Sequence, residues 1–237
     1  MGAVPGRALA RHTWSPPDVN ASEDFTATTH GGPVTLLFLC AHKDLRLDEK
    51  QALRARLRAA RRAHVAALPA SMRGLVFLRP PSPVAALVPE GSIVGLYHAV
   101  GAEAPAGGYA RWLLENGRSL ALPWFANRES PMQFRRWADP FNDSDLEPGP
   151  WGALQPCAAA DELTPGTVFV PLLGFTAAGV RLGQGGGHYD RWLEANPQTM
   201  ALGLGWDCQL CDSLPIEPHD VHLRGVITPT RFYEGTR

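Results

Sequence analysis

Short apolar segments without a clean alternation of hydrophobic and polar positions recur along this chain. Strands that are buried on both faces of a parallel sheet have this pattern, because neither face needs polar side chains. Pro and Gly separate the segments from one another. The pattern predicts five strands, at residues 93–97, 119–123, 167–175, 200–206 and 223–228.

Helical patterns lie before and between these strands. Residues 47–68 repeat apolar positions near helical spacing, with acidic residues at the start and basic residues towards the end, and Pro69 ends the pattern. Residues 107–116 and 188–195 can form two further helices. Alternating strands and helices predict an α/β fold: three layers, with a mostly parallel sheet and helices on both faces (Rossmann-like). Ligands of such sheets bind beyond the carboxyl ends of the strands.

Two regions fit this pattern poorly. Residues 1–46 are predicted to be a poorly ordered N-terminal extension, in which residues 34–40 form an edge strand or dock on the body, and residues 47–237 a single α/β domain. Residues 127–152 read as a long aromatic loop. Such a loop is either a functional lid or contains strands that the pattern misses.

Composition narrows the possible partners. The 237 residues carry 22 basic and 23 acidic side chains, a formal charge of −1, which predicts no general attraction to nucleic acid or to an anionic membrane. The longest apolar run, residues 34–41, is too short to span a bilayer. Four cysteines are too few for a disulfide framework, and Cys208 and Cys211 form a lone C-x-x-C, so we expect reduced thiols and a cytoplasmic protein. The oligomeric state is open, with a monomer slightly favoured.

The densest chemical signal is a glycine-rich turn within residues 168–193. An apolar strand leads to Arg181, then to four glycines in five positions (183, 185, 186 and 187), and then to a helix. Such glycines allow positive φ angles and close approach of the main chain, so that successive amides and the helix N-terminus can cradle an anion. Arg181 can neutralise phosphate, and Asp190 can hold a divalent cation. The alternative is a flexible surface loop.

Two familiar phosphate motifs are absent. No Lys follows residue 50, so there is no P-loop, and a dinucleotide G-x-G-x-x-G would need Gly where His188 stands. Asp207 follows a predicted strand at a spacing suited to a ribose contact. A nicotinamide-dependent oxidoreductase therefore remains an alternative.

The turn resembles the 5-formyltetrahydrofolate cyclo-ligase (methenyltetrahydrofolate synthetase) family, whose pattern is P-x-x-x-F-D followed by R-L-G-x-G-x-G-Y-Y-D. The resemblance extends over roughly residues 47–230 and includes Lys50-x-x-x-Arg54, Glu103 after the first strand, Leu122-Pro123 and the segment from Trp151 to Pro156. The positions that match the turn pattern are Pro171, Phe175, Arg181, Leu182, Gly183, Gly185, Gly187, Tyr189 and Asp190.

This resemblance implies a cyclo-ligase type of α/β fold and an ATP-dependent ring closure. The formyl oxygen of 5-formyltetrahydrofolate attacks the γ-phosphate of ATP, N10 then attacks the formyl carbon, and phosphate leaves to give 5,10-methenyltetrahydrofolate. Phosphoryl transfer of this kind requires positioning and charge neutralisation more than acid–base groups. The implied partners are ATP, Mg²⁺ and a folate.

The resemblance also implies roles for individual residues. Lys50 and Arg181 are the expected catalytic residues, and Asp190 and Asp220 the expected Mg²⁺ ligands. His98, Glu103, Trp151 and His188 are expected to contact the folate. The expected nucleotide-binding residues are Lys50, Arg54, Arg181, Leu182, Gly183, Gln184, Gly185, Gly186, Gly187, His188 and Tyr189.

Each assignment has a structural alternative. Lys50 and Arg54 lie one helical turn apart and are otherwise a solvated basic face; Trp151 is otherwise a core residue. His98 is otherwise an ordinary residue at a strand end, and Asp220 a turn residue.

The chain departs from the family pattern at several positions, including Gln155, Thr176, His188 and Arg224, and it lacks the Thr expected after Glu103. A second hypothesis is therefore a nucleotide-binding regulatory relative that has lost cyclo-ligase activity.

Overall fold

The computed structural model describes residues 34–73, 75–217 and 220–235. The chain divides into two compact units, residues 1–42 and 43–237. Of the first unit only the start of helix α1 (Val34–Ala67) is described, so the poor order predicted for residues 1–33 lies outside the described residues. The edge strand proposed for residues 34–40 is wrong, because α1 begins at Val34. No Gly or Pro interrupts the chain between Val34 and Leu68, so nothing local stops the helix from extending backwards.

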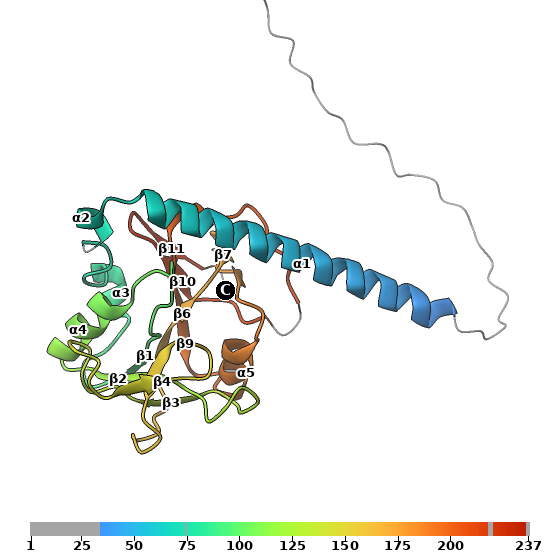
Figure 1. Cartoon of the computed structure of the whole chain (residues 1–237). Coiled ribbons are helices and arrows are strands. Elements are labelled where there is room, and N and C mark those ends of the chain that lie inside the picture. The colour runs from blue at the N-terminus through green and yellow to red at the C-terminus, as the bar shows by residue number, and fades with distance from the viewer. Residues whose placement is uncertain (1–33, 74, 218–219, 236–237) are drawn as a thin grey trace, which may run out of the picture. The chain divides into compact units, whose positions relative to one another are not determined.

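The larger unit is built on a seven-stranded sheet of order β11-β10-β9-β6-β1-β2-β3 (Figure 1). The five central strands are parallel to their neighbours, and the two edge strands, β3 and β11, are antiparallel. All five predicted strands are confirmed, with shorter bounds at most ends. The strands are β1 (Ile93–Gly95), β2 (Ser119–Trp124), β3 (Gln133–Arg136), β6 (Thr167–Pro171), β9 (Met200–Leu204), β10 (Gly225–Ile227) and β11 (Phe232–Glu234).

Helices and two small ladders complete the described elements. The predicted helices at residues 107–116 and 188–195 are confirmed as α4 and α5. The antiparallel pairs β4–β5 and β7–β8 lie outside the main sheet. These elements are α2 (Ala70–Arg73), α3 (Ser82–Ala86), α4 (Gly107–Glu115), α5 (His188–Ala195), the 3-10 turn η1 (Asp207–Gln209), β4 (Leu146–Pro148), β5 (Leu154–Pro156), β7 (Gly174–Phe175) and β8 (Arg181–Leu182).

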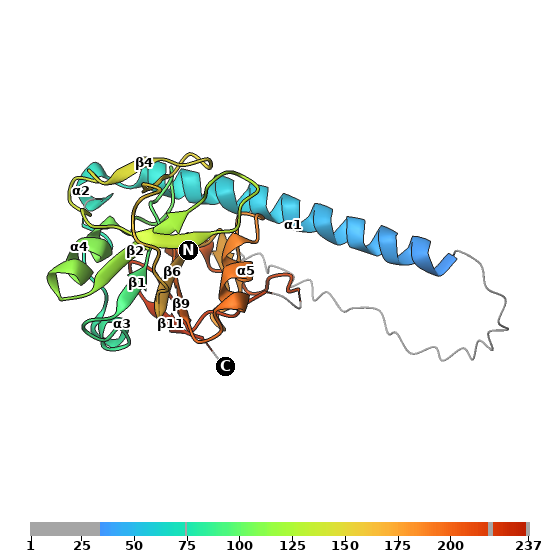
Figure 2. The ribbon, with the colours of Figure 1, turned by 90° about the horizontal axis from the view of Figure 1, so that it is seen from below.

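The sheet is buried on both faces, as its apolar strands predicted. In β6, Phe169 packs into the cluster that contains Tyr109 of α4, whereas Val168 and Val170 pack into the cluster that contains Leu193 of α5. The Tyr109 and Phe169 rings meet edge to face at 5.7 Å between centroids. Figures 1 and 2 show α4 and α5 on opposite sides of the sheet. The three-layer prediction is therefore confirmed.

The long loop predicted at residues 127–152 is wrong in part, because it contains β3 and β4. Strand β3 has the sequence Gln-Phe-Arg-Arg and no apolar run. Its arginines are used at the sheet edge, where the Arg135 guanidinium lies over the Trp124 ring at 3.9 Å from the ring centroid. An edge strand needs only one buried position, here Phe134, so its pattern resembles a loop.

Candidate functional site

The glycine-rich turn joins β8 to α5 beyond the carboxyl end of β6. Gly185 has φ +109° and Gly187 has φ +63°, so two of the four glycines adopt the positive φ that the sequence predicted. Gly187 is also the N-cap of α5, and its carbonyl accepts from the Arg191 amide at 3.1 Å. The α5 N-terminus therefore opens directly from the turn, an arrangement that favours an anion.

Arg181 enters the turn with a buried side chain that is only 5% exposed. Its Nη2 donates to Asp190 Oδ1, while its Nη1 is buried without a hydrogen-bond partner among the described residues. Burial lowers the pKa of Arg181, and the nearby Asp190, Tyr189 and Asp220 oppose that shift. A buried N–H without an acceptor is costly, so a phosphate oxygen is the kind of group that fits here.

Lys50 lies in a buried ionic cluster, which excludes the solvated-face alternative for this residue. Its side chain is 7% exposed, and its Nζ lies 2.8 Å from Glu217 Oε1 and 3.7 Å from Asp220 Oδ2. The Glu217 amide donates to Asp220 Oδ2 at 2.7 Å, which fixes the Asp220 carboxylate in its loop. Asp220 therefore serves as a turn residue and also as a partner of Lys50. Glu217 was missed from the sequence; its only signal was its position three residues before Asp220.

Helix α1 holds the turn from one side. Arg54 Nε donates to the Gly183 carbonyl at 3.2 Å, and Arg58 Nη2 donates to Gln184 Oε1 at 2.9 Å. The structure thus brings Lys50 and Arg54 to the turn that contains Arg181, as the motif implied. Arg58 was missed because a row of helical arginines does not indicate which of them face the body.

The two predicted metal ligands each face a cation. Asp190 pairs with Arg181, and Asp220 lies beside Lys50. Both carboxylates are close enough to Arg181 to affect its pKa. The described residues contain no group of three or more His, Cys, Asp or Glu that could hold a metal ion. These residues therefore do not form a protein-only cage, but they fit a Mg²⁺ that keeps phosphate and water ligands, as Mg²⁺ usually does.

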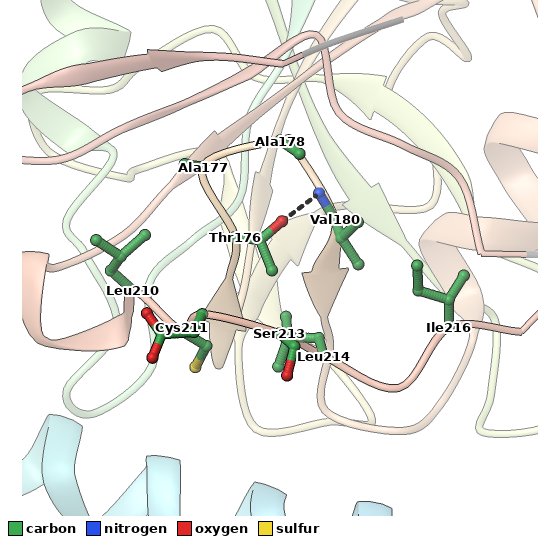
Figure 3. A pocket seen from close by; sticks show the side chains of 10 residues that line it. Thr176, Ala177, Ala178, Val180, Leu210, Cys211, Ser213, Leu214 and Ile216 are labelled. Atoms are coloured by element: carbon green, nitrogen blue, oxygen red, sulfur yellow. Dashed lines mark hydrogen bonds between the residues drawn. The ribbon is translucent and has the colours of Figure 1, made fainter. Parts of the chain in front are cut away.

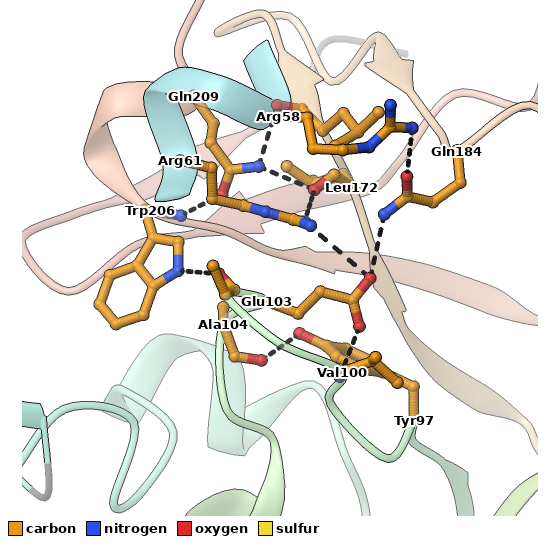
Figure 4. A network of polar contacts seen from close by, with 12 residues as sticks. Arg58, Arg61, Tyr97, Val100, Glu103, Ala104, Leu172, Gln184, Trp206 and Gln209 are labelled. Atoms are coloured by element: carbon orange, nitrogen blue, oxygen red, sulfur yellow. Dashed lines mark hydrogen bonds and ion pairs between the residues drawn. The ribbon is translucent and has the colours of Figure 1, made fainter. Parts of the chain in front are cut away.

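Glu103, in the loop after β1, faces the same turn. Its side chain is 11% exposed; Oε2 accepts from the Val100 amide at 3.0 Å, and Oε1 accepts from Gln184 Nε2 at 3.2 Å. Gln184, expected to contact nucleotide, uses its side chain for Glu103 and Arg58 instead (Figure 4).

His188 and Trp151 form an aromatic group with Phe125. The His188 ring lies 5.0 Å from the Phe125 ring and 5.2 Å from the Trp151 ring, centroid to centroid. Burial and the neighbouring Arg191 lower the pKa of His188, which favours a neutral ring. Trp151 is 47% exposed, so the core alternative is wrong and a flat aromatic face is open to solvent. Gln155, a departure from the family pattern, makes hydrogen bonds to both the amide and the carbonyl of Phe125.

The structure does not place His98 in contact with the turn. His98 Nε2 lies 3.3 Å from Asp143 Oδ2, at a cavity of about 170 Å³ that is also lined by Tyr97 and Trp137. The Tyr97 hydroxyl donates to the Ala104 carbonyl at 2.5 Å, in the loop that contains Glu103. His98 is thus one residue from the Glu103 network but faces a separate cavity.

A further cavity, of about 520 Å³, lies between the β7–β8 hairpin and residues 210–216 (Figure 3). None of the predicted site residues lines it, although Val180 and Ile216 on its wall immediately precede Arg181 and Glu217. Thr176, another departure from the family pattern, accepts from the Val180 amide at 3.3 Å inside this hairpin. Thr176 therefore has a structural role in the β7–β8 turn.

Asp207 does not offer a free carboxylate for a ribose. Its Oδ1 accepts from the Thr228 hydroxyl at 2.6 Å and from the Thr230 hydroxyl at 2.5 Å. This arrangement removes the observation on which the oxidoreductase alternative rested. Cys208 and Cys211 are free thiols, and within the described part of the chain no helix is both long and apolar enough to cross a bilayer.

Comparison with known proteins points in one direction. The model of the 5-formyltetrahydrofolate cyclo-ligase family matches residues 46–229. The 5-formyltetrahydrofolate cyclo-ligase of Mycolicibacterium smegmatis is 32% identical over 153 residues, which cover 60% of this chain and 76% of that protein. The Escherichia coli enzyme of the same name is 42% identical over 69 residues, which cover 28% of this chain and only 38% of the relative.

A solved structure has the same fold. The 5,10-methenyltetrahydrofolate synthetase of Mycoplasma pneumoniae superposes with a TM-score of 0.54 at 21% identity, covering 75% of this chain and 97% of that one. The mostly parallel α/β architecture is therefore that of a known group of structures.

Proposed function

Since the chain belongs to the 5-formyltetrahydrofolate cyclo-ligase family, we propose that it converts 5-formyltetrahydrofolate to 5,10-methenyltetrahydrofolate with ATP and Mg²⁺, releasing ADP and phosphate. The observation that carries this proposal is the convergence of buried cations on the glycine-rich turn. Lys50 and Arg181 are both more than nine-tenths buried, and Arg181 has an N–H without an acceptor among the described residues.

The proposed reaction needs those cations. The formyl oxygen attacks the γ-phosphorus and ADP leaves; N10 then attacks the formyl carbon and loses its proton, and phosphate departs. An amide oxygen is a poor leaving group, whereas a phosphate is a good one, so the phosphoryl transfer makes ring closure feasible. Charge on the transferred group is neutralised by Arg181 and Lys50, while the amides of residues 183–187 and the α5 N-terminus position the nucleotide phosphates.

The folate is proposed to lie between Glu103 and the aromatic group of His188 and Trp151. A flat heterocycle suits the exposed Trp151 face, and a fixed carboxylate can accept from N–H groups of a pterin. A neutral His188 contributes an aromatic surface without adding charge. Departures at Gln155 and Thr176 are absorbed by backbone hydrogen bonds, so neither carries a free polar group into this space.

Asp190 and Asp220 are proposed to hold Mg²⁺ together with phosphate oxygens. The ion would supply additional charge neutralisation at the phosphates when bound. Without the ion, the two carboxylates are neutralised by Arg181 and Lys50.

The test is direct. Purified protein is mixed with 5-formyltetrahydrofolate and Mg-ATP, and the absorbance of the methenyl product is followed beside the release of ADP. We expect stoichiometric product and ADP, with loss of both in K50M. No methenyl product at high protein concentration, with ATP still bound, would overturn the proposal and support the regulatory relative.

A further inference from the structure

One face of α1 contacts both sides of the proposed active site. Arg54, Arg58 and Arg61 follow one another at helical spacing and lie on the same face of the helix. Arg54 and Arg58 contact the glycine-rich turn at Gly183 and Gln184. Arg61 instead contacts the end of β6, where its Nη1 donates to the Leu172 carbonyl at 3.3 Å, and lies 3.9 Å from Glu103 Oε1.

Arg61 is not placed where stability alone would put an arginine. Its side chain is 6% exposed, and its Nε is buried without a partner among the described residues. Burial lowers the pKa of Arg61, and Glu103 is the largest influence that opposes the shift. Replacing a buried ionic contact of this kind with an apolar residue of similar size is often neutral or stabilising. The side chain therefore calls for an explanation other than stability.

Gln184 supplies the second half of the contact. Its Oε1 accepts from Arg58 and its Nε2 donates to Glu103 Oε1, so both ends of the amide are engaged and its orientation is fixed. Figure 4 shows Arg61 and Gln184 approaching the Glu103 carboxylate from different elements. The Val100 amide completes the set on Oε2. Glu103 is thus held by its own loop, by α1 and by the glycine-rich turn.

We propose that Arg61 is a positioning residue which, together with Gln184, couples folate binding at Glu103 to nucleotide binding at the glycine-rich turn. A nucleotide that orders the turn also fixes Gln184, and Gln184 and Arg61 then hold Glu103 in one orientation. By linkage, folate held on Glu103 strengthens nucleotide binding by the same factor. This inference rests on the proposed function.

The experiment measures the dissociation constant of a non-hydrolysable ATP analogue with Mg²⁺ by calorimetry, with and without saturating 5-formyltetrahydrofolate. The ratio of the two constants is the coupling factor. We expect about fivefold or more for the unmodified chain, a ratio near one for R61M and for Q184A, and partial recovery in R61K. The matched control is R62M at the exposed neighbouring position, which should keep the full factor.

A steady-state measurement separates positioning from structure. In R61M we expect the KM for the folate to rise with the nucleotide affinity measured alone unchanged, while the melting temperature stays the same or rises. Should R61M fail to fold, Q184A decides the question, because the Gln184 side chain is exposed and its loss leaves the core intact.

The outcomes distinguish this inference from the proposed function. Methenyl product with full coupling in both R61M and Q184A would overturn the coupling role and leave the enzyme assignment standing. A coupling factor of one in the unmodified chain would do the same. An unmodified chain that neither binds folate nor forms product would overturn the proposed function, and the coupling role with it.

Discussion

Arg181 uses only one of its two terminal nitrogens on a described protein group, the Asp190 carboxylate. R181K should therefore keep a positive charge beside Asp190 but lose the planar fork that can also reach a phosphate. We expect the dissociation constant of the ATP analogue to rise about tenfold, equal to about 1.4 kcal/mol, with the far-ultraviolet circular dichroism unchanged. R224K, at the exposed pair with Glu234, is the control. Unchanged affinity in R181K would contradict the role given to Arg181.

His188 predicts how stability depends on pH. Burial, and then Arg191, lower the pKa of His188 below its ordinary value of 6.5. The unfolded chain therefore takes up a proton at pH values where the folded chain resists it, so stability is lost as pH falls through 6.5 towards the folded pKa. We expect a small drop in melting temperature between pH 7.5 and pH 5 that H188F reduces. The exposed His222 provides the control H222Q; an equal reduction there would contradict the assignment.

Individual site residues were predictable where a motif carried them. Lys50, Arg54 and Arg181 belong to a spaced pattern, and the structure brings them to one turn. Arg58, Arg61 and Glu217 were not predictable, because a helix with many arginines does not reveal which face is buried until the sheet beneath it is known. The burial of Arg61 depends on Leu172 and Glu103, which lie far away in sequence.

At the scale of elements, the start of α5 depends on a backbone that only glycine adopts easily. Gly187 is the N-cap of the helix at φ +63°, and a Cβ there would lie 2.8 Å from Arg191 Nη1, the flexible end of a side chain. G187A should lower the free energy of unfolding by about 1–2 kcal/mol and weaken nucleotide binding. Urea denaturation measures the first effect and calorimetry the second.

The control for G187A is G166A. A Cβ added at Gly166 would meet no atom within 4 Å, and the φ angle of Gly166 is not positive. Ala should therefore be tolerated there, with stability unchanged or raised by about 0.4–1 kcal/mol. Equal losses in the two variants would show that the cost at position 187 does not come from its left-handed conformation.

The elements themselves were predictable to the extent that they bury apolar side chains. The five central strands and α4 and α5 were found because both faces of the sheet are covered, which leaves apolar runs in the sequence. Strand β3 was missed because it pairs on one side only and presents arginines at the edge. The start of α1 was missed because its apolar run at residues 34–40 suits a strand as well as a helix.

For the molecule as a whole, the sheet explains why distant segments share one site. Strands β1 and β6 are parallel neighbours, so the loops that follow them begin at the same edge. One loop carries Glu103 and the other leads through β7 and β8 to Arg181. Ligand sites of open α/β sheets lie at this edge. The sequence predicted the edge, but the side chains that link the two loops depended on α1.

The division of the chain at residue 42 gives a test of where the function resides. All proposed site residues lie within residues 43–237, and the family model begins at residue 46. A chain of residues 43–237 should therefore fold, bind the ATP analogue with affinity within about threefold of the full chain, which is less than 1 kcal/mol, and form product. A chain of residues 53–237 lacks Lys50, leaves Glu217 and Asp220 without that cation, and should lose nucleotide binding. Loss of binding in the longer fragment would instead mean that the first unit contributes to the site, and would move the boundary of the functional domain towards the N-terminus.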